Sequence, residues 1–332
     1  MKAAVITGDL RQAKRVYDDV ITEKLKQRYE LCSEIINKKN IQKHKEFLKE
    51  TEYLFATWGM ERFTRDEIKQ YFPKARCVFY AAGSVQGFAR DFLECDIRVF
   101  SAWQANAVPV AEYTYAQILL AAKGFFRAER KARWFFYPSA EYADACGGNY
   151  KVRVGIIGVG SIGALVAEKL KENDAEVLYY DPFLSAEKAE RLNIQKAELT
   201  DIFSECDVIT NHLANKEELT GVLSGELFAK MKPYATFINT GRGRQVDEKG
   251  LVKAMKKVKT RTALLDVTSC EPLPPLGRLA RCKNIIVTPH IAGSLGREVV
   301  RMAQYMLEEA ERLNRSEEPL YEVTLDLLET MA

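Results

Sequence analysis

Short apolar runs alternate with longer amphipathic stretches along the first third of the chain. The runs from Lys2 to Thr7, Tyr53 to Trp58, Cys77 to Ala81 and Ile97 to Phe100 are rich in residues that favour strands. Gly8 to Tyr29 places apolar residues near one face and many Lys and Arg residues on the other, which predicts one long helix. Strands that alternate with helices at this spacing indicate a parallel α/β sheet.

Three smaller features add detail to this region and to the segment that follows it. Leu31 to Ile36 is a further candidate strand. Thr64 and Glu67 have the spacing of a capping box, which predicts that a helix begins there. Asn106 to Lys123 is apolar and predicts a long helix with Pro109 near its first turn, where proline is tolerated.

A glycine-rich segment organises the rest of the chain. Val152 to Ile157 is short and apolar, as a buried parallel strand should be. The next three glycines have G-x-G-x-x-G spacing and precede a run of strong helix formers; they are Gly158, Gly160 and Gly163. The first glycine permits a tight turn, the second lets a phosphate approach the backbone, and the third lets helix and strand pack closely. In this context the motif predicts a dinucleotide site, the alternative being a glycine-rich turn that binds nothing.

Asp181 follows a second strand, Val177 to Tyr180, about 20 residues beyond the glycines. A carboxylate at this position accepts hydrogen bonds from a ribose 2′-hydroxyl and repels a 2′-phosphate. The sequence therefore predicts NAD rather than NADP as the cofactor.

Three polar residues, Arg242, Glu271 and His290, follow the ends of successive predicted strands. The later strands are Cys206 to Thr210, Ala235 to Asn239, Thr262 to Val267 and Ile285 to Thr288. Separately, these residues could be a solvated charge, a loop residue and a turn residue. Ligands of an open parallel sheet lie beyond the carboxyl ends of its strands, so together the three residues predict a catalytic group.

The predicted roles follow from hydride transfer to an electron-poor carbonyl carbon. Histidine is well matched to protonating the alkoxide near neutral pH, and Glu271 can fix the His290 tautomer and favour its protonated form. The Arg242 guanidinium can hold a carboxylate bidentately and polarise the adjacent carbonyl, so the set suits a 2-oxo acid. His44 is expected at the surface. His212 is a candidate for the cofactor cleft with no assigned proton transfer.

The length and composition narrow the class of protein. The chain has 332 residues, which suggests about two domains, and its 49 basic and 46 acidic residues are too balanced for a nucleic-acid partner. The seven cysteines are scattered without a C-x-x-C pair, so neither a metal site nor a disulfide framework is expected. With no leader or membrane-spanning run visible, we expect a cytoplasmic protein with no membrane partner.

The ordered motifs resemble the D-isomer-specific 2-hydroxyacid dehydrogenase family over nearly the whole chain. The matching pieces are Gly158 to Gly163, Asp181, Asn239 to Gly243, Leu265 to Pro272 and Thr288 to Gly293. The sequence from Leu265 to Pro274 is similar to that of the glyoxylate/hydroxypyruvate reductase branch. The resemblance implies an NAD-dependent enzyme acting on CH-OH donors, which interconverts a 2-oxo acid and a D-2-hydroxy acid.

The resemblance also implies roles for individual residues. His290 would be the acid/base, Glu271 its support and Arg242 a substrate ligand. Cofactor positions would be Ser161, Ile162, Thr240 and Asp266, besides the three glycines and Asp181, and substrate positions Gly83, Ser84 and Asn106. The chain departs from the family pattern at Ser161, where Arg is common, at Ala214, where Pro is common, and in the loop around Gly83, which lacks the usual Gly-x-Asp.

The implied architecture is α/β, with a Rossmann dinucleotide-binding domain (105–294) inserted in a discontinuous flavodoxin-like substrate domain (1–104 and 295–332), both with parallel sheets. Family members are usually homodimers. The aromatic-rich stretch from Ala128 to Tyr150, which includes Trp134, lies where an arm reaches the partner.

A second class of function shares this fold. NAD(H)-sensing binding proteins of the corepressor type can keep the same three polar groups, so the residues alone do not exclude that function. Absorbance of NADH in the presence of a panel of 2-oxo acids would separate the two.

Overall fold

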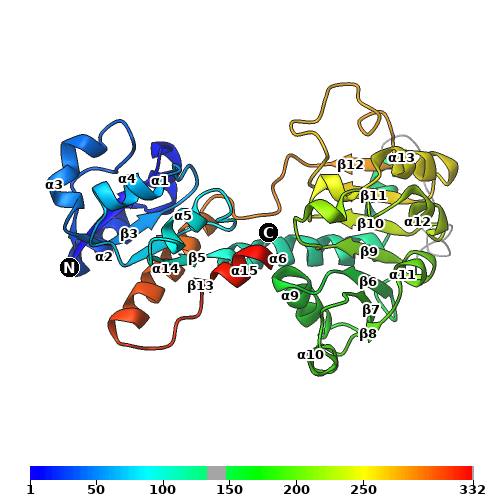
Figure 1. Ribbon diagram of the computed structural model, residues 1–332. Helices are drawn as coiled ribbons and strands as arrows, with labels where there is room; N and C mark the ends of the chain where they lie inside the picture. Colours follow the sequence, from blue (N-terminus) through cyan, green and yellow to red (C-terminus); the bar gives the residue numbers. More distant parts are fainter. Residues whose placement is uncertain (133–146, 331–332) are drawn as a thin grey trace. The chain divides into compact units, whose positions relative to one another are not determined.

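The computed structural model describes residues 1–132 and 147–330 and separates into two compact units (Figure 1). The first unit comprises Met1–Asn106 and Ser294–Ala332, and the second Ala107–Gly293. Each unit has its own β-sheet with helices, so the predicted α/β class is confirmed. The proposed arm, from Trp134 to Tyr142, lies outside the described residues. No helix within the described ranges has both the length and the apolar character needed to cross a membrane.

The first unit contains a six-stranded sheet in the order β13-β5-β4-β3-β1-β2. Its strands are β1 (Lys2–Ile6), β2 (Glu30–Leu31), β3 (Thr51–Ala56), β4 (Cys77–Tyr80), β5 (Arg98–Ser101) and β13 (Glu322–Val323). All neighbours pair in parallel except β13, which pairs antiparallel with β5 at the edge. Its helices are α1 (Leu10–Val16), α2 (Asp19–Arg28), η1 (Ile41–His44), α3 (Lys45–Leu48), α4 (Arg65–Tyr71), α5 (Ala89–Leu93), α14 (Glu298–Asn314) and α15 (Leu325–Thr330).

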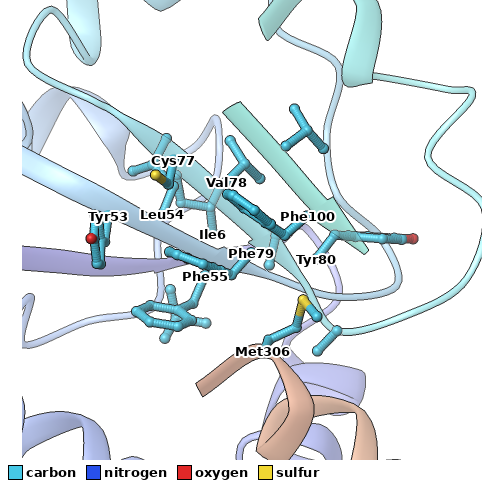
Figure 2. Packing of buried hydrophobic residues seen from close by; sticks show 14 of the residues in the cluster. Ile6, Tyr53, Leu54, Phe55, Cys77, Val78, Phe79, Tyr80, Phe100 and Met306 are labelled. Atoms are coloured by element: carbon cyan, nitrogen blue, oxygen red, sulfur yellow. The ribbon is translucent and has the colours of Figure 1, made fainter. Parts of the chain in front are cut away.

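Aromatic side chains from neighbouring strands form the centre of this unit (Figure 2). Phe55, Phe79 and Phe100 are completely buried and stack across β3, β4 and β5, with ring centroids 5.2 and 5.1 Å apart. Met306 of α14 belongs to the same cluster. Cross-strand aromatic pairs of this kind fix the register of a sheet as well as burying area, so they hold β3, β4 and β5 together.

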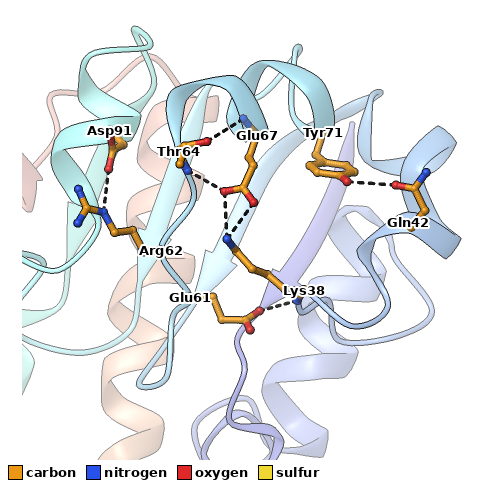
Figure 3. A network of polar contacts seen from close by, with 8 residues as sticks. All are labelled: Lys38, Gln42, Glu61, Arg62, Thr64, Glu67, Tyr71 and Asp91. Atoms are coloured by element: carbon orange, nitrogen blue, oxygen red, sulfur yellow. Dashed lines mark hydrogen bonds and ion pairs between the residues drawn. The ribbon is translucent and has the colours of Figure 1, made fainter.

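The predicted capping box at the start of α4 is confirmed (Figure 3). Thr64 Oγ1 accepts a hydrogen bond from Glu67 N at 3.3 Å, and Glu67 Oε2 accepts one from Thr64 N at 2.9 Å. Lys38 Nζ also contacts both Glu67 carboxylate oxygens, at 2.9 and 3.0 Å. The Thr64 backbone amide, followed by Lys38, lowers the pKa of the Glu67 carboxyl.

Two helices replace the single one predicted from Gly8 to Tyr29. α1 ends at Val16, and α2 begins at Asp19 because Asp18 Oδ1 accepts a hydrogen bond from Ile21 N at 2.9 Å. Asp18 therefore starts a new helix, although the helical spacing of apolar residues continues across this point in the sequence.

Two further predictions were wrong in detail. The strand expected from Leu31 to Ile36 contracts to β2 and one isolated bridge between Ile6 and Ile36. The helix expected from Asn106 is α6 (Trp103–Ala122), which starts earlier, so that Pro109 lies inside it rather than in its first turn.

The second unit contains a seven-stranded, all-parallel sheet in the order β12-β11-β10-β9-β6-β7-β8. Its strands are β6 (Arg153–Ile157), β7 (Glu176–Tyr180), β8 (Gln195–Lys196), β9 (Val208–Asn211), β10 (Thr236–Asn239), β11 (Thr262–Leu265) and β12 (Ile285–Val287). Besides most of α6, its helices are α7 (Phe125–Ala132), α9 (Ser161–Leu170), α10 (Ala186–Leu192), α11 (Leu199–Glu205), η2 (Glu217–Leu219), α12 (Gly225–Lys230), η3 (Gly243–Gln245) and α13 (Glu248–Lys257).

Helices cover both faces of this sheet. Phe237 of β10 belongs to a core shared with α11, α12 and α13, whereas the next residue, Ile238, belongs to a core shared with α6, α9 and α10. Successive strand residues face opposite sides, so a strand covered on both sides must be apolar throughout. This explains why β6 and β9 to β11 are mostly apolar and, apart from the first residue of β6, buried throughout.

The strand order reverses beside β6, which lies between β7 and β9. In open parallel sheets, ligands bind beyond the carboxyl ends of the strands at such a reversal. The residues that follow these ends are Gly158 after β6, Asp181 after β7, His212 after β9, Thr240 after β10, Asp266 after β11 and Thr288 after β12. The fold of the second unit therefore places most of the predicted site residues at one edge of one sheet.

Candidate functional site

The glycine turn connects β6 to α9. Gly158 has a φ of +84°, and a Cβ there would lie 2.9 Å from backbone atoms of His212 and Leu213. A Cβ at Gly163 would lie 2.1 Å from the Gly158 carbonyl oxygen, whereas one at Gly160 would meet nothing within 4 Å. Gly160 is the N-cap of α9 and makes no side-chain capping bond, so the backbone approach to this helix N-terminus is open.

The first residues of α9 differ in their surroundings. Ser161 is exposed at the first position of the helix, and Ile162 is partly buried against the core of the unit. Ser161 therefore offers a hydroxyl beside the helix N-terminus, and Ile162 anchors the turn to the sheet.

Asp181 lies beside the glycine turn. Its Oδ2 accepts a hydrogen bond from Val159 N at 2.8 Å, and its Oδ1 accepts one from Phe183 N at 2.9 Å. These two backbone donors fix the plane of the carboxylate next to the dinucleotide turn. Each oxygen retains a further lone pair, which a ribose hydroxyl could use.

His212 is buried, in contrast to the other two histidines, and lies beneath this edge of the sheet. Its Nε2 lies 3.0 Å from Thr210 Oγ1, and its Nδ1 lies 3.4 Å from Thr240 Oγ1, which in turn contacts Thr114 Oγ1 at 3.2 Å. Burial lowers the pKa of His212 to about 3. The imidazole is therefore neutral near pH 7 and supports the turn without exchanging protons.

Arg242 lies in the turn after β10. Its Nη1 donates to the Gly241 carbonyl at 2.8 Å, and the residue is partly buried. Burial lowers the pKa of the guanidinium, while the charge of Glu271 acts in the opposite direction. Arginine remains protonated in proteins, so this is a partly desolvated positive charge with Glu271 in its field.

Glu271 and His290 form the central contact of the site. His290 Nδ1 lies 2.8 Å from Glu271 Oε2, while Glu271 Oε1 accepts a hydrogen bond from Thr268 N at 3.1 Å. The side chains of His290 and Glu271 remain 53% and 40% exposed, so the imidazole is reachable from solvent. Because the carboxylate engages Nδ1, the Nε2 atom is left to face a reacting molecule.

The backbone at His290 is unusual. Its φ is +56°, in the left-handed region that few residues other than glycine adopt. The His290 amide donates to the carbonyl oxygens of Asp266 and Thr288, both at 3.0 Å. Strained residues of this kind concentrate at functional sites, where the surrounding structure holds them in place.

Asp266 holds this turn. It is buried, and its Oδ1 accepts hydrogen bonds from Thr288 Oγ1 at 2.6 Å and Ile291 N at 2.9 Å. Its Oδ2 accepts one from Ala292 N at 2.8 Å. Three donors within the Thr288–Ala292 turn therefore fix the backbone on either side of His290.

A close backbone approach joins the Arg242 turn to the Glu271 loop. A Cβ at Gly243 would lie 1.9 Å from the carbonyl carbon of Thr268 and 2.4 Å from Ser269 N. Any side chain at this position would push the two segments apart. Gly243 thereby sets the separation between the loops that carry the guanidinium and the carboxylate.

The three predicted substrate residues of the first unit lie in two segments, the loop after β4 and helix α6. Gly83 and Ser84 follow β4, and the Gly83 carbonyl accepts a hydrogen bond from Ser101 Oγ at 2.6 Å. Asn106 lies in α6, and its Oδ1 accepts a hydrogen bond from Ser294 N at 3.0 Å. Gly83, Ser84 and Asn106 belong to the first unit, whereas Arg242, Glu271 and His290 belong to the second.

Several residues that support the site had no sequence prediction. Asn211 and Gln245 are completely buried and hydrogen-bonded to each other, and Tyr113 contacts Thr288 with its hydroxyl at 3.0 Å. A signal existed for Asn211, which ends an otherwise apolar strand with a polar residue. Among the described residues, no group of three or more His, Cys, Asp or Glu side chains could hold a metal ion.

Comparison with known proteins identifies the family of this arrangement. Residues 115–292 match the family model described as D-isomer specific 2-hydroxyacid dehydrogenase, NAD binding domain. The match covers more than half of the chain and spans the residues from the glycine turn to His290.

Two relatives extend the comparison. The chain is 30% identical to a glyoxylate reductase of Korarchaeum cryptofilum over 256 residues, which cover 76% of this chain and 77% of that enzyme. It is 32% identical to a D-3-phosphoglycerate dehydrogenase of Synechocystis over 213 residues, which cover 64% of this chain but only 38% of that enzyme. The chain thus spans less than half the length of the phosphoglycerate dehydrogenase that it matches.

The fold is also found among solved structures. A phosphoglycerate oxidoreductase of Rhizobium etli superposes with a TM-score of 0.83 at 22% identity, over 98% of this chain and 99% of that one. At this identity the likeness establishes the two-domain fold and nothing finer.

Proposed function

This chain belongs to the D-isomer specific 2-hydroxyacid dehydrogenase family, and from that premise we propose that it interconverts a 2-oxo acid and a D-2-hydroxy acid with NAD. The observation that carries the proposal is the 2.8 Å contact between His290 Nδ1 and Glu271 Oε2. The two residues follow the neighbouring strands β12 and β11, and Arg242 follows the adjoining β10. An oriented imidazole beside a guanidinium at one sheet edge suits reduction of a carbonyl next to a carboxylate.

The residues of the second unit fit NAD. We assign its pyrophosphate to the open turn at Gly160 and the uncapped N-terminus of α9, and its adenosine ribose to Asp181. The other proposed cofactor residues are Gly158, Ser161, Ile162, Gly163, Thr240 and Asp266. When bound, the reduced cofactor supplies the hydride that the carbonyl carbon accepts.

His290 supplies the proton in the proposed reduction. Its Nδ1 hydrogen is directed to Glu271, so Nε2 is the atom that donates to the developing alkoxide. In the reverse direction the same atom accepts the hydroxyl proton. Glu271 keeps the ring in this orientation.

Arg242 binds the substrate carboxylate in this proposal. A planar guanidinium can donate two parallel hydrogen bonds to a carboxylate, and its partial burial strengthens that interaction. Gly83, Ser84 and Asn106 of the first unit are proposed as additional substrate contacts, on the strength of the family pattern.

The test is oxidation of NADH, followed by absorbance, with a panel of 2-oxo acids that includes glyoxylate and hydroxypyruvate. Turnover with at least one acid, and no turnover without an acid, is the expected result. NADH binding without turnover across the whole panel would contradict the enzyme proposal and favour an NAD(H)-sensing binding protein.

We further propose a homodimer in the cytoplasm. The free cysteines among the described residues suit a reducing compartment, and the aromatic composition of the stretch around Trp134 suits a partner surface. Sedimentation that shows only a 37.7 kDa species at micromolar concentration would contradict the dimer. Fractionation of cells that express the protein would test the compartment.

Asp181→Ala should narrow the preference for NADH over NADPH. The wild-type carboxylate repels a 2′-phosphate, so the NADPH KM should exceed the NADH KM clearly, and the variant should reduce that gap about tenfold or more, equivalent to about 1.4 kcal/mol. Steady-state kinetics with both cofactors at a saturating 2-oxo acid measures the change. Glu187→Ala is the matched control, because it removes an exposed acidic charge from the following helix. Equal kcat/KM values of the wild type for the two cofactors would refute the role of Asp181.

Glu271→Gln should lower kcat for reduction. The amide keeps the shape of the side chain, but it can turn its NH2 group toward His290 Nδ1, so it no longer fixes the orientation of the ring. An ion pair this exposed is worth about 0.2–1 kcal/mol, which predicts a fall in kcat of about 1.4- to 5-fold. The measurement is kcat at saturating NADH and saturating 2-oxo acid.

Glu248→Gln is the control for this measurement. Glu248 Oε1 and Oε2 accept hydrogen bonds from Ser269 N at 2.7 Å and Ser269 Oγ at 2.8 Å, so it supports the same loop without contacting His290. Its kcat should equal that of the wild type. An unchanged kcat in Glu271→Gln would mean that Glu271 does not orient His290.

A further inference from the structure

Three completely buried carboxamides lie beneath the Arg242 turn. Asn211 Nδ2 donates to Asn239 Oδ1 at 3.0 Å and to Gln245 Oε1 at 2.8 Å. Burying an amide is costly unless its donors and acceptors are all used. The bonding of this group is nearly complete, which gives it one preferred arrangement.

Gln245 uses all of its hydrogen-bonding capacity. Besides the bond from Asn211, its Oε1 accepts one from Arg242 N at 3.2 Å. Its Nε2 donates to the carbonyl oxygens of Leu213 at 3.2 Å and Ala214 at 2.7 Å. A single side chain therefore ties the loop after β9 to the turn after β10.

Both backbone polar groups of Arg242 end on this carboxamide network. Its N–H donates to Gln245, and its carbonyl oxygen accepts a hydrogen bond from Asn239 Nδ2 at 3.3 Å. Because the guanidinium also donates to the Gly241 carbonyl, the side chain starts from a fixed backbone and is held again at its tip.

The other end of the carboxamide network reaches the dinucleotide turn. Asn211 Oδ1 accepts a hydrogen bond from Leu213 N at 3.3 Å. The His212–Leu213 backbone is the surface on which Gly158 packs, since a Cβ at Gly158 would lie 2.9 Å from it. A continuous chain of contacts therefore runs from the glycine turn through Asn211 and Gln245 to Arg242.

We propose that Asn211 and Gln245 are positioning residues that hold Arg242 at a fixed place relative to the dinucleotide turn. An apolar pair could fill the same space without the cost of burying amides, but it would leave the Arg242 backbone amide unheld. The inference rests on the proposed binding of the substrate carboxylate by Arg242. Substrate and cofactor must meet within a fraction of an ångström, so a fixed guanidinium contributes to orientation of the substrate.

The first test uses Gln245→Leu and the paired variant Asn211→Leu with Gln245→Leu, which removes both partners of the Asn211–Gln245 hydrogen bond, so that neither carboxamide is left without the other. With glyoxylate, or another acid that the wild type reduces, kcat/KM should fall about 10- to 100-fold, mainly through a higher KM. The dissociation constant of NADH should change less than about threefold. An unchanged KM in both variants would overturn the proposal.

Asn284→Leu is the matched control. Asn284 is another buried carboxamide of the second unit, and its Nδ2 donates to the Met255 and Arg261 carbonyls at 3.0 and 2.8 Å. This substitution should lower Tm while leaving the substrate KM unchanged. A KM increase as large as that in Gln245→Leu would mean that general destabilisation explains the effect.

A double-mutant cycle tests whether Gln245 affects kcat/KM through Arg242. If Gln245 acts through Arg242, Gln245→Leu should cost less than about twofold in kcat/KM when introduced into Arg242→Ala. An equal loss in both backgrounds would overturn the positioning role, because the side chain would then act independently of Arg242.

Amide hydrogen exchange separates this proposal from the proposed function. If the wild type reduces no 2-oxo acid, the proposed function fails, and the positioning role is judged on exchange of the Arg242 amide. Gln245→Leu should speed that exchange about tenfold or more, whereas Asn284→Leu should leave it unchanged, because only the first substitution removes the acceptor of the Arg242 amide. Unchanged exchange would overturn the positioning role.

Discussion

His290→Gln is expected to lower kcat for reduction of a 2-oxo acid by about 10²- to 10⁴-fold while NADH still binds. Glutamine can reach a similar volume and can still hydrogen-bond to Glu271, but it has no proton to give to an alkoxide near neutral pH. The loss should therefore appear in kcat at saturating substrate, with a smaller change in KM. Single-turnover kinetics of the preformed NADH complex measures the chemical step directly.

The backbone at residue 290 calls for a second variant. Because its φ is +56°, glutamine could disturb the turn as well as remove the acid. Asparagine adopts this conformation more readily, so His290→Asn should keep the turn and lose the same activity. If His290→Asn retained a kcat within about threefold of the wild type, His290 would not be the proton donor.

The parts of the fold that the sequence predicts are those set by local pattern. The strands β3, β4, β6 and β9 to β12 are mostly apolar, and the central strands of the second unit are buried because helices cover both faces of their sheet. The capping box at Thr64 was also predicted, since it needs only a few consecutive residues. The glycine turn belongs to this class, because its strand, glycines and helix are contiguous.

Features that depend on distant residues, or on a single hydrogen bond within an apolar period, were not predicted. The segment that follows α14 carries no sequence motif. It nevertheless supplies β13, which pairs antiparallel with β5 at the edge of the first sheet. The division between α1 and α2 depends on one capping aspartate inside a continuous apolar period. In both places tertiary packing or a single hydrogen bond outweighs the periodic signal.

The candidate site likewise contains contacts that the sequence predicts and contacts that it does not. The meeting of Glu271 and His290 could be anticipated, because each follows a neighbouring strand of a parallel sheet and such ends share one edge. The bonds from Asp266 to the His290 turn, and those from Gln245 to the Arg242 turn, could not be anticipated. They depend on side-chain directions and loop geometry that no spacing encodes.

Burial also changes the interpretation of a residue that the sequence left open. His212 has the position of a cofactor-cleft residue, but both of its ring nitrogens contact buried threonine hydroxyls. With its pKa lowered to about 3 by burial, it remains neutral over the pH range in which the proposed reaction would be measured. Among the described histidines, the site therefore has one candidate proton donor in contact with a carboxylate at this sheet edge, and that is His290.

Arg242→Lys is expected to raise the KM for a 2-oxo acid and to lower kcat, with a combined loss in kcat/KM of about 10- to 150-fold. Lysine keeps the charge but donates from a single point, so one of two charge-assisted hydrogen bonds, each worth about 1.5–3 kcal/mol, is lost. KM rises because the carboxylate is held less tightly. The fall in kcat follows because the carbonyl is no longer oriented or polarised in the same way. Initial rates over a range of acid concentrations at saturating NADH separate the two effects.

Arg244→Lys provides the comparison. Arg244 lies two positions further along the same turn and is exposed, and its charge acts on Arg242 without replacing it. The same chemical change there should alter kcat/KM by less than about threefold, because exposed charges contribute little. Equal losses in the two variants would mean that only net positive charge matters at this edge. A loss confined to Arg242→Lys means that the planar fork itself is required, as bidentate binding of a carboxylate demands.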